Sequence, residues 1–151
     1  MIIFKIFLRT ILLIPLSDQK YKFRDKKLNK MANHNETGKL GEDIATRYLL
    51  KKGYKVLDRN WRWNKKELDI IAFDGDLLVF IEVKTRKYGS LENPKDAVTR
   101  KKQKFIISAA NAYIDAKNIE KEVRLDIISV ILRDKENIIE HIEDAFQPIV
   151  S

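Results

Sequence analysis

Apolar side chains recur at helical spacing in two stretches of the chain. The first stretch begins near Thr37 and ends at Gly53, and its apolar positions are Leu40, Ile44, Ala45, Tyr48 and Leu49. Intervals of three and four residues put such positions on one face of a helix, which a glycine commonly terminates. The second stretch covers residues 95–117, with apolar positions Val98, Phe105, Ile106, Ala109, Ala110, Tyr113 and Ile114. The pattern therefore predicts two amphipathic helices.

Between and after these helices, runs of apolar residues predict strands at 54–63, 67–73, 77–86 and 123–132. The sequence Asp-Gly-Asp at 74–76 is a strong turn signal and predicts a hairpin between the second and third strands. The third strand is apolar on both faces before Glu82, which is typical of a central, covered strand. Residues 87–94 are expected to form a loop, and residues 138–146 a last edge strand. The predicted order is α-β-β-β-α-β with an extra strand.

The first thirty residues differ from the rest. They contain eight Lys/Arg against two Asp/Glu, whereas residues 31–151 contain twenty-two against twenty, so most of the +8 net charge belongs to the N-terminus. The apolar run at 1–16 is too short to span a membrane. We expect residues 1–30 to be a poorly ordered or mis-assigned extension and residues 31–151 to form a single domain. A membrane-surface anchor at 1–30 is the alternative; our preferred interpretation is a cytoplasmic protein with no stable membrane span.

The amino-acid inventory limits the chemistry. The chain has no cysteine, which excludes disulfides and thiolate zinc sites, and its two histidines, His34 and His141, are far apart in sequence. A metal would therefore be held by oxygen ligands, which favours Mg²⁺ or Mn²⁺.

Acidic residues on the second and third predicted strands suggest such a site. Glu67 and Asp69 share one face of the second strand, and Glu82 and Lys84 share one face of the third. Carboxylates in apolar runs are costly to bury unless they are paired or bind a cation. If the two strands form a hairpin, the acids and the lysine converge. Phosphodiester hydrolysis needs a metal that neutralises phosphate charge and an amine that orients the attacking water or stabilises the transition state.

These residues resemble a known family. Gly41-Glu42, Asn60, Glu67-Leu-Asp69-Ile-Ile, Phe80-Ile-Glu82-Val-Lys84-Thr85-Arg86 and the run from Lys102 to Tyr113 look like the uncharacterised YraN-like family of small bacterial proteins. That family is assigned to the restriction-endonuclease-like PD-(D/E)xK nuclease superfamily, which includes archaeal Holliday-junction resolvases. The resemblance covers residues 38–146. It implies an α/β fold with a restriction-endonuclease-like α-β-β-β-α-β core, in which helices flank a mixed central sheet.

The resemblance also implies roles. Asp69, Glu82 and Glu42 correspond to metal-binding carboxylates, Lys84 to the catalytic lysine, and Gln103 or a neighbouring lysine to a helix residue near the site. Two positions depart from the pattern: Leu68 stands in place of a proline, and Lys66 in place of a glycine. Glu42 is explained equally by helix capping, and Glu67 by a solvated or supporting position.

Basic residues surround the expected site in sequence. One cluster lies between Lys51 and Lys66 and another between Arg100 and Lys104. We expect nucleic-acid contacts from Arg62, Lys65, Lys66, Arg86, Lys102 and Gln103. Trp61 and Trp63 either stack on bases or pack in the fold, and Asp126 is expected to form a structural pair with Arg124 or a hairpin lysine.

Two functional hypotheses follow. The first is a magnesium-dependent endonuclease acting on structured or single-stranded nucleic acid, DNA above all, with a homodimer implied by analogy to junction nucleases. The second is a nucleic-acid-binding module that keeps the nuclease fold without turnover.

Overall fold

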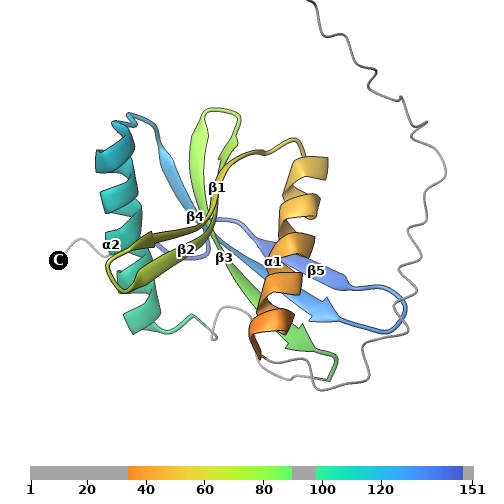
Figure 1. The fold of residues 1–151 in the computed structure, drawn as a ribbon. Helices are drawn as coiled ribbons and strands as arrows, with labels where there is room; N and C mark the ends of the chain where they lie inside the picture. The colour runs from red at the N-terminus through yellow and green to blue at the C-terminus, as the bar shows by residue number, and fades with distance from the viewer. Residues whose placement is uncertain (1–33, 90–97, 148–151) are drawn as a thin grey trace, which may run out of the picture.

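The computed structural model describes residues 34–89 and 98–147. Two helices, α1 (His34–Lys51) and α2 (Arg100–Lys117), lie on opposite faces of one sheet, as Figure 1 shows. The strands are β1 (Lys55–Trp63), β2 (Lys66–Asp74), β3 (Leu77–Lys87), β4 (Val123–Leu132) and β5 (Ile138–Ile142). Among the residues described, no helix has the length and apolarity needed to cross a membrane.

The sheet is mixed, with spatial order β1-β2-β3-β4-β5. β3 and β4 are parallel, and the other neighbouring pairs are antiparallel. Parallel neighbours need a crossover connection, and α2 occupies that connection between β3 and β4. The predicted α/β class, element order and mixed sheet flanked by helices are confirmed. The arrangement is consistent with a nuclease-like α/β core.

Each helix covers its own hydrophobic core, because β3 alternates its side chains between the two faces. Leu78 and Phe80 pack under α2, against Ile106, Ala109 and Tyr113. On the other face, Val79, Ile81 and Val83 pack under α1 against Ala45 and Leu49. β3 is thus covered on both sides, as its apolar composition predicts.

Several element boundaries differ from the predicted ones. α1 begins at His34 rather than near Thr37. α2 begins at Arg100 rather than at residue 95, because the hydroxyl of Thr99 accepts the backbone N–H of Lys102 and caps the helix. β5 ends at Ile142 rather than 146. Phe105 is 42% exposed, so its place in the buried stripe of α2 was wrong. The expectations for residues 1–30 and for most of the 87–94 loop concern positions outside the residues described.

α1 approaches the sheet closely at Gly41. A Cβ at this position would overlap Oγ1 of Thr85 on β3 and come within 2.9 Å of the Cβ of Thr85. Glycine is therefore required here by a close approach of the helix backbone to a strand. The contact fixes the first turns of α1, and with them Glu42, against the carboxyl-terminal half of β3.

A buried polar cluster lies under the C-terminal end of α1. Asp126 on β4 is fully buried, and both its oxygens accept hydrogen bonds from Arg124, at 3.0–3.2 Å. Nε2 of His141 on β5 lies 2.9 Å from Oδ2 of Asp126, and the backbone N–H of Asp144 donates to Oδ1. Burial alone would raise the pKa of Asp126, but hydrogen bonds from His141, Arg124 and Asp144 hold it below its ordinary value. The predicted structural role of Asp126, paired with Arg124, is confirmed.

We predict that Gly41→Ala lowers the free energy of unfolding by about 1–3 kcal/mol, because the new methyl group forces α1 away from Thr85. Gly38→Ala is the matched control in the same helix: nothing lies within 4 Å of its added Cβ. It should stabilise the protein by about 0.5–1 kcal/mol through helix propensity. Urea unfolding followed by circular dichroism measures both changes, and equal effects of the two substitutions would refute the close contact.

We also predict that Asp126→Asn lowers the free energy of unfolding by roughly 3 kcal/mol at neutral pH, because it leaves the buried guanidinium of Arg124 undercompensated. Asp74, 3.1 Å from Arg124, limits the loss. Since the pKa of Asp126 is lower in the folded than in the unfolded protein, its ionisation stabilises the fold above about pH 4. This stability is lost as the pH falls through the folded-state pKa.

The difference between wild type and Asp126→Asn should therefore shrink as the pH falls below about 4, as measured by urea unfolding from about pH 5 to about pH 3. Asp76→Asn is the control, because the Asp76 side chain is 97% exposed where it pairs with Lys121. It should change stability little at any pH. A gap that widens in acid would contradict the assignment.

Candidate active site

The candidate site forms where β2 and β3 separate. The antiparallel ladder between them runs from Asp74↔Leu77 to Ile70↔Ile81. Beyond it, the carboxylate of Asp69 accepts the backbone N–H of Val83 at 2.8 Å, taking a place that a strand carbonyl would otherwise fill. β2 stays paired with β1 as far as Trp63↔Lys66. The sheet therefore forks at Asp69, and the β1–β2 hairpin continues away from β3.

Glu82 lies at the base of this fork and is almost completely buried, with 4% of its side chain exposed. Its two oxygens meet two lysines. Nζ of Lys84, two residues along β3, lies 2.8 Å from Oε1, and Nζ of Lys102 on α2 lies 3.1 Å from Oε2. The predicted proximity of Glu82 and Lys84 on one strand face is confirmed, and α2 supplies a second amine.

Asp69 and Glu82 are close enough to affect one another's charge. Burial, and then the negative charge of Glu82, raise the pKa of Asp69 to about 7; Glu42 contributes in the same direction. The hydrogen bond from Val83 and the positive charge of Lys102 oppose this shift. Asp69, Glu82, Glu42 and Lys102, which come from four elements, thus share one electrostatic environment.

Glu42 is held by Asn60, a residue that the family resemblance includes but to which the sequence assigned no role. Nδ2 of Asn60 on β1 donates to Oε2 of Glu42 at 2.6 Å, and Arg59 lies 4.0 Å from the same oxygen. Asn60 has φ 50°, in the left-handed region that asparagine tolerates better than most residues. An asparagine within a strand is the signal that could have suggested a special role for it. Glu42, Asn60, Arg62 and Glu67 line a groove of about 490 Å³ between α1 and the hairpin.

Across residues 34–89 and 98–147, no three carboxylate or imidazole groups lie close enough to form a complete metal cage. Glu42 bonds to Asn60 and both oxygens of Glu82 bond to lysines, and in the described part of the chain the three predicted ligands do not form such a cage. The donor chemistry still fits Mg²⁺ or Mn²⁺, because Mg²⁺ is commonly held by one or two carboxylates, with water and substrate phosphate completing its shell. Asp69 and Glu82 are the pair that meets this requirement.

The residues expected to contact nucleic acid fall into two groups. Lys102 lies in the site, and Gln103 beside it donates to the carbonyl of Val98 at the start of α2. Arg62, Lys65 and Lys66 lie on the hairpin: Arg62 is 3.4 Å from Glu67, Lys65 is exposed in the turn, and Lys66 donates to Ser108 on α2 at 2.7 Å. Arg86 is half-buried on β3.

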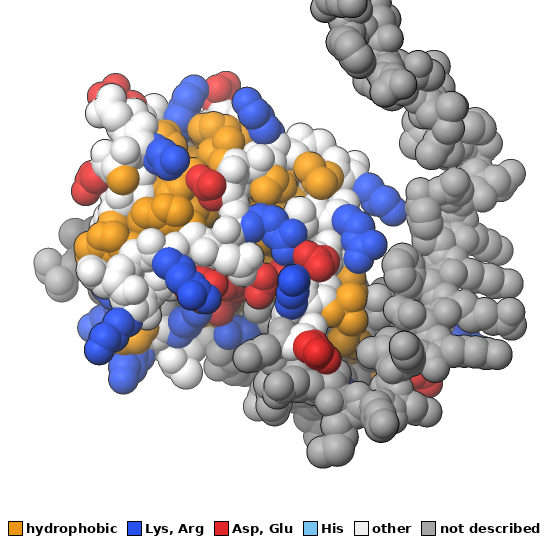
Figure 2. Space-filling model, in the orientation of Figure 1, with side chains coloured by type: hydrophobic (Ala, Val, Ile, Leu, Met, Phe, Trp, Pro, Cys, Tyr) orange, Lys and Arg blue, Asp and Glu red, His pale blue; other side chains and the backbone are white. Residues whose placement is uncertain are grey.

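Glu67 pairs with Arg62, whose side chain is 75% exposed, and no contact joins it to Asp69 or Glu82 among the residues described, which favours the solvated position left open for it. Figure 2 shows acidic side chains gathered between the β1–β2 hairpin and α1, with Lys and Arg side chains around them.

Comparisons with known proteins identify the family of this chain. The model of the uncharacterised protein family UPF0102 matches residues 41–130. A UPF0102 protein of Phocaeicola vulgatus is 49% identical over 118 residues, which are 78% of this chain and 98% of that protein. UPF0102 proteins of Parabacteroides distasonis and Flavobacterium psychrophilum are 48% and 45% identical, each over 77% of this chain and over 96% and 98% of their own lengths. The matched region contains Glu42, Asp69, Glu82, Lys84 and Lys102. The YraN-like resemblance is therefore confirmed, and this chain belongs to the uncharacterised protein family UPF0102.

Proposed function

We propose that this protein is a metal-dependent endonuclease that hydrolyses phosphodiester bonds in structured or single-stranded nucleic acid, DNA above all. One observation carries the proposal. At the fork between β2 and β3, the carboxylates of Asp69 and Glu82 lie close enough for each to affect the charge of the other, and the amines of Lys84 and Lys102 lie against Glu82. Acids and amines in one small space are the groups that hydrolysis of a phosphodiester requires.

Asp69 and Glu82 are the residues that would hold Mg²⁺ or Mn²⁺. When bound, such an ion neutralises charge on the phosphate and activates water. The hydrogen bond from the backbone N–H of Val83 fixes the orientation of Asp69, since that N–H belongs to the rigid central strand. Lys84 and Lys102 likewise fix the orientation of Glu82, because each pairs with one of its two carboxylate oxygens.

Lys84 and Lys102 supply positive charge for the reaction. Both side chains remain partly exposed, 28% for Lys84 and 35% for Lys102, so their amines can reach a substrate phosphate at the mouth of the fork. An amine there stabilises the negative charge that develops on the phosphate oxygens. Lys84 also suits the orientation of the attacking water, because it leaves the same strand face as Glu82.

We predict that the purified protein with Mg²⁺ or Mn²⁺ cleaves at least one member of a panel of single-stranded, flapped and four-way-junction DNAs. Asp69→Asn and Lys84→Met should each reduce the cleavage rate by about 100-fold or more, because each removes a group that acts on the transition state. Gel assays with end-labelled DNA measure the rates.

Lys121→Met is the matched control for Lys84→Met. Lys121 pairs with the exposed Asp76 and has no contact with the fork, so its loss should leave the rate unchanged. Failure of every DNA to be cut, or equal rates for wild type and both site variants, would count against the enzyme.

A second function is favoured by the ion pairs of Glu82. A carboxylate whose two oxygens are both taken by lysines is already neutralised without a cation. The protein would then bind nucleic acid through its basic residues without cleaving it. A metal-binding measurement distinguishes the two functions. Only in the enzyme must an oxygen of Glu82 leave its lysine and bind a metal ion.

We predict that calorimetric titration with Mn²⁺ detects millimolar or tighter binding, and that Glu82→Gln abolishes it by removing a charged ligand. Glu143→Gln is the control: Glu143 is half-exposed and lies near Lys52 and Arg124, in the other polar cluster. Its titration should match wild type. DNA binding that weakens with salt yet ignores metal, with no heat from Mn²⁺ in any variant, would instead identify the silent binding module.

A further inference from the structure

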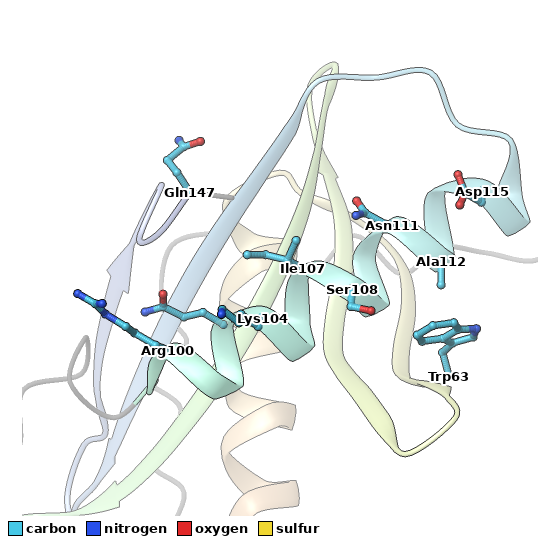
Figure 3. A pocket seen from close by; sticks show the side chains of 10 residues that line it. Trp63, Arg100, Lys104, Ile107, Ser108, Asn111, Ala112, Asp115 and Gln147 are labelled. Carbon is cyan, nitrogen blue, oxygen red and sulfur yellow. The ribbon is translucent and has the colours of Figure 1, made fainter. Parts of the chain in front are cut away.

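A groove runs along the outer side of α2, on the opposite side of the hairpin from the groove that contains Glu42. Its volume is about 440 Å³, within the range of roughly 300–1,000 Å³ that is typical of small-molecule sites. Figure 3 shows that Trp63 enters it from the β1–β2 hairpin, Gln147 from beyond β5, and the remaining labelled side chains from α2. α2 therefore forms most of the groove wall, and the hairpin supplies its aromatic ring.

The groove wall combines three kinds of chemistry. Trp63 contributes an aromatic ring, Arg100 and Lys104 contribute positive charge, and Ser108, Asn111 and Asp115 contribute hydrogen-bonding groups. An indole ring can stack on any base, since every base has a π face. Guanidinium and ammonium groups pair with phosphate. Amide and carboxylate groups match the donors and acceptors on the edge of a base. One wall thus offers a partner to each part of a nucleotide.

The two tryptophans of the chain have different environments. Trp61 is partly buried and packs edge-on against Tyr113, with ring centroids 5.1 Å apart. Trp63 is 37% exposed, and Nζ of Lys66 lies over its ring, 4.9 Å from the centroid. Trp61 therefore packs in the fold, whereas the ring of Trp63 remains available to a ligand.

Lys66 anchors this arrangement. Its amine donates to Ser108 and also lies 5.7 Å from the ring centroid of Phe105. The lysine thus ties the hairpin to α2 and places a positive charge over one face of the indole, so a base would stack on the other face. Residues 102 and 103 of α2 join the groove to the candidate active site, because Lys102 contacts Glu82 and its neighbour Gln103 lines the groove.

We propose that this groove is a subsite for a short single-stranded segment, in which one unpaired base stacks on Trp63 while Lys104 and Arg100, which lie further along α2, contact the phosphates of the neighbouring nucleotides. The inference rests on the proposed function, because it identifies the substrate as nucleic acid with an unpaired base close to the scissile bond. Stacking on an indole needs the full face of a base, which a base pair inside a continuous duplex does not offer. The substrate class is therefore single-stranded or locally unpaired nucleic acid.

Two single-tryptophan proteins test the subsite. Trp61→Phe leaves Trp63 as the only tryptophan, and Trp63→Phe leaves Trp61. Each is titrated with a twelve-residue oligothymidylate in the presence of EDTA, so that metal and cleavage play no part. Stacking should quench the fluorescence of Trp63 strongly and leave that of Trp61 nearly unchanged. Circular dichroism confirms that both variants are folded.

A second measurement separates the base from the phosphates. Wild type should bind oligothymidylate about tenfold more tightly than Trp63→Ala does. An abasic oligomer with the same number of phosphates should bind equally to both proteins, because it has nothing to stack. Asn111→Ala, which leaves Trp63 in place, should weaken oligothymidylate binding but retain the quenching.

Equal quenching of the two tryptophans, no quenching of Trp63, or an equal loss of abasic binding in Trp63→Ala would overturn the subsite. These results do not depend on catalysis. If Trp63 is quenched but no DNA is ever cut, the endonuclease fails and the subsite stands. If DNA is cut but the fluorescence of Trp63 is not quenched, the endonuclease stands and the subsite fails.

Discussion

The burial of one carboxylate dominates this fold. Glu82 lies in the middle of the central strand with 4% of its side chain exposed, and a charge in that position must be balanced. Lys84 balances it from the same strand and Lys102 from a helix that follows in sequence. The ion pair of Lys102 with Glu82 favours a position of α2 in which Lys102 faces β3, and the hydrophobic contacts of Ile106, Ala109 and Tyr113 favour the same position. Charge compensation and hydrophobic packing thus specify the same position for the helix.

The rest of the site follows from how neighbouring elements meet at that carboxylate. Asp69 takes the N–H of Val83 and opens the sheet, so the β1–β2 hairpin is free to lie beside α2. Gly41 lets α1 approach Thr85, and Asn60 reaches back from β1 to hold Glu42. A sheet without the fork would leave neither groove, because both are walled by the hairpin on one side and a helix on the other.

The sequence predicted what depends on local periodicity. Alternation along a strand placed Glu82 beside Lys84, and the turn at 74–76 brought Asp69 to the neighbouring strand. It could not predict contacts that depend on packing over a distance, such as that of Lys102 with Glu82, or the bond from Asn60 to Glu42. The two tryptophans look alike in sequence, since they are two residues apart on the same strand. Trp61 nevertheless packs against Tyr113, whereas Trp63 is the last residue of β1 and is exposed. His141 gave no signal, since nothing local indicates that its strand borders a buried aspartate.

The irregularity of β1 has a consequence for the behaviour of the protein in solution. β1 lies at one margin of the sheet, where unpaired backbone groups can recruit a strand from another molecule. Its ladder with β2 shifts register between Val56 and Asp58, and Asn60 departs from extended geometry a few residues later. Exposed Lys55, Arg59 and Arg62 add like charges along the same margin. The distortion that holds Glu42 thus also makes this edge a poor template for intermolecular β-pairing and protects the protein against aggregation.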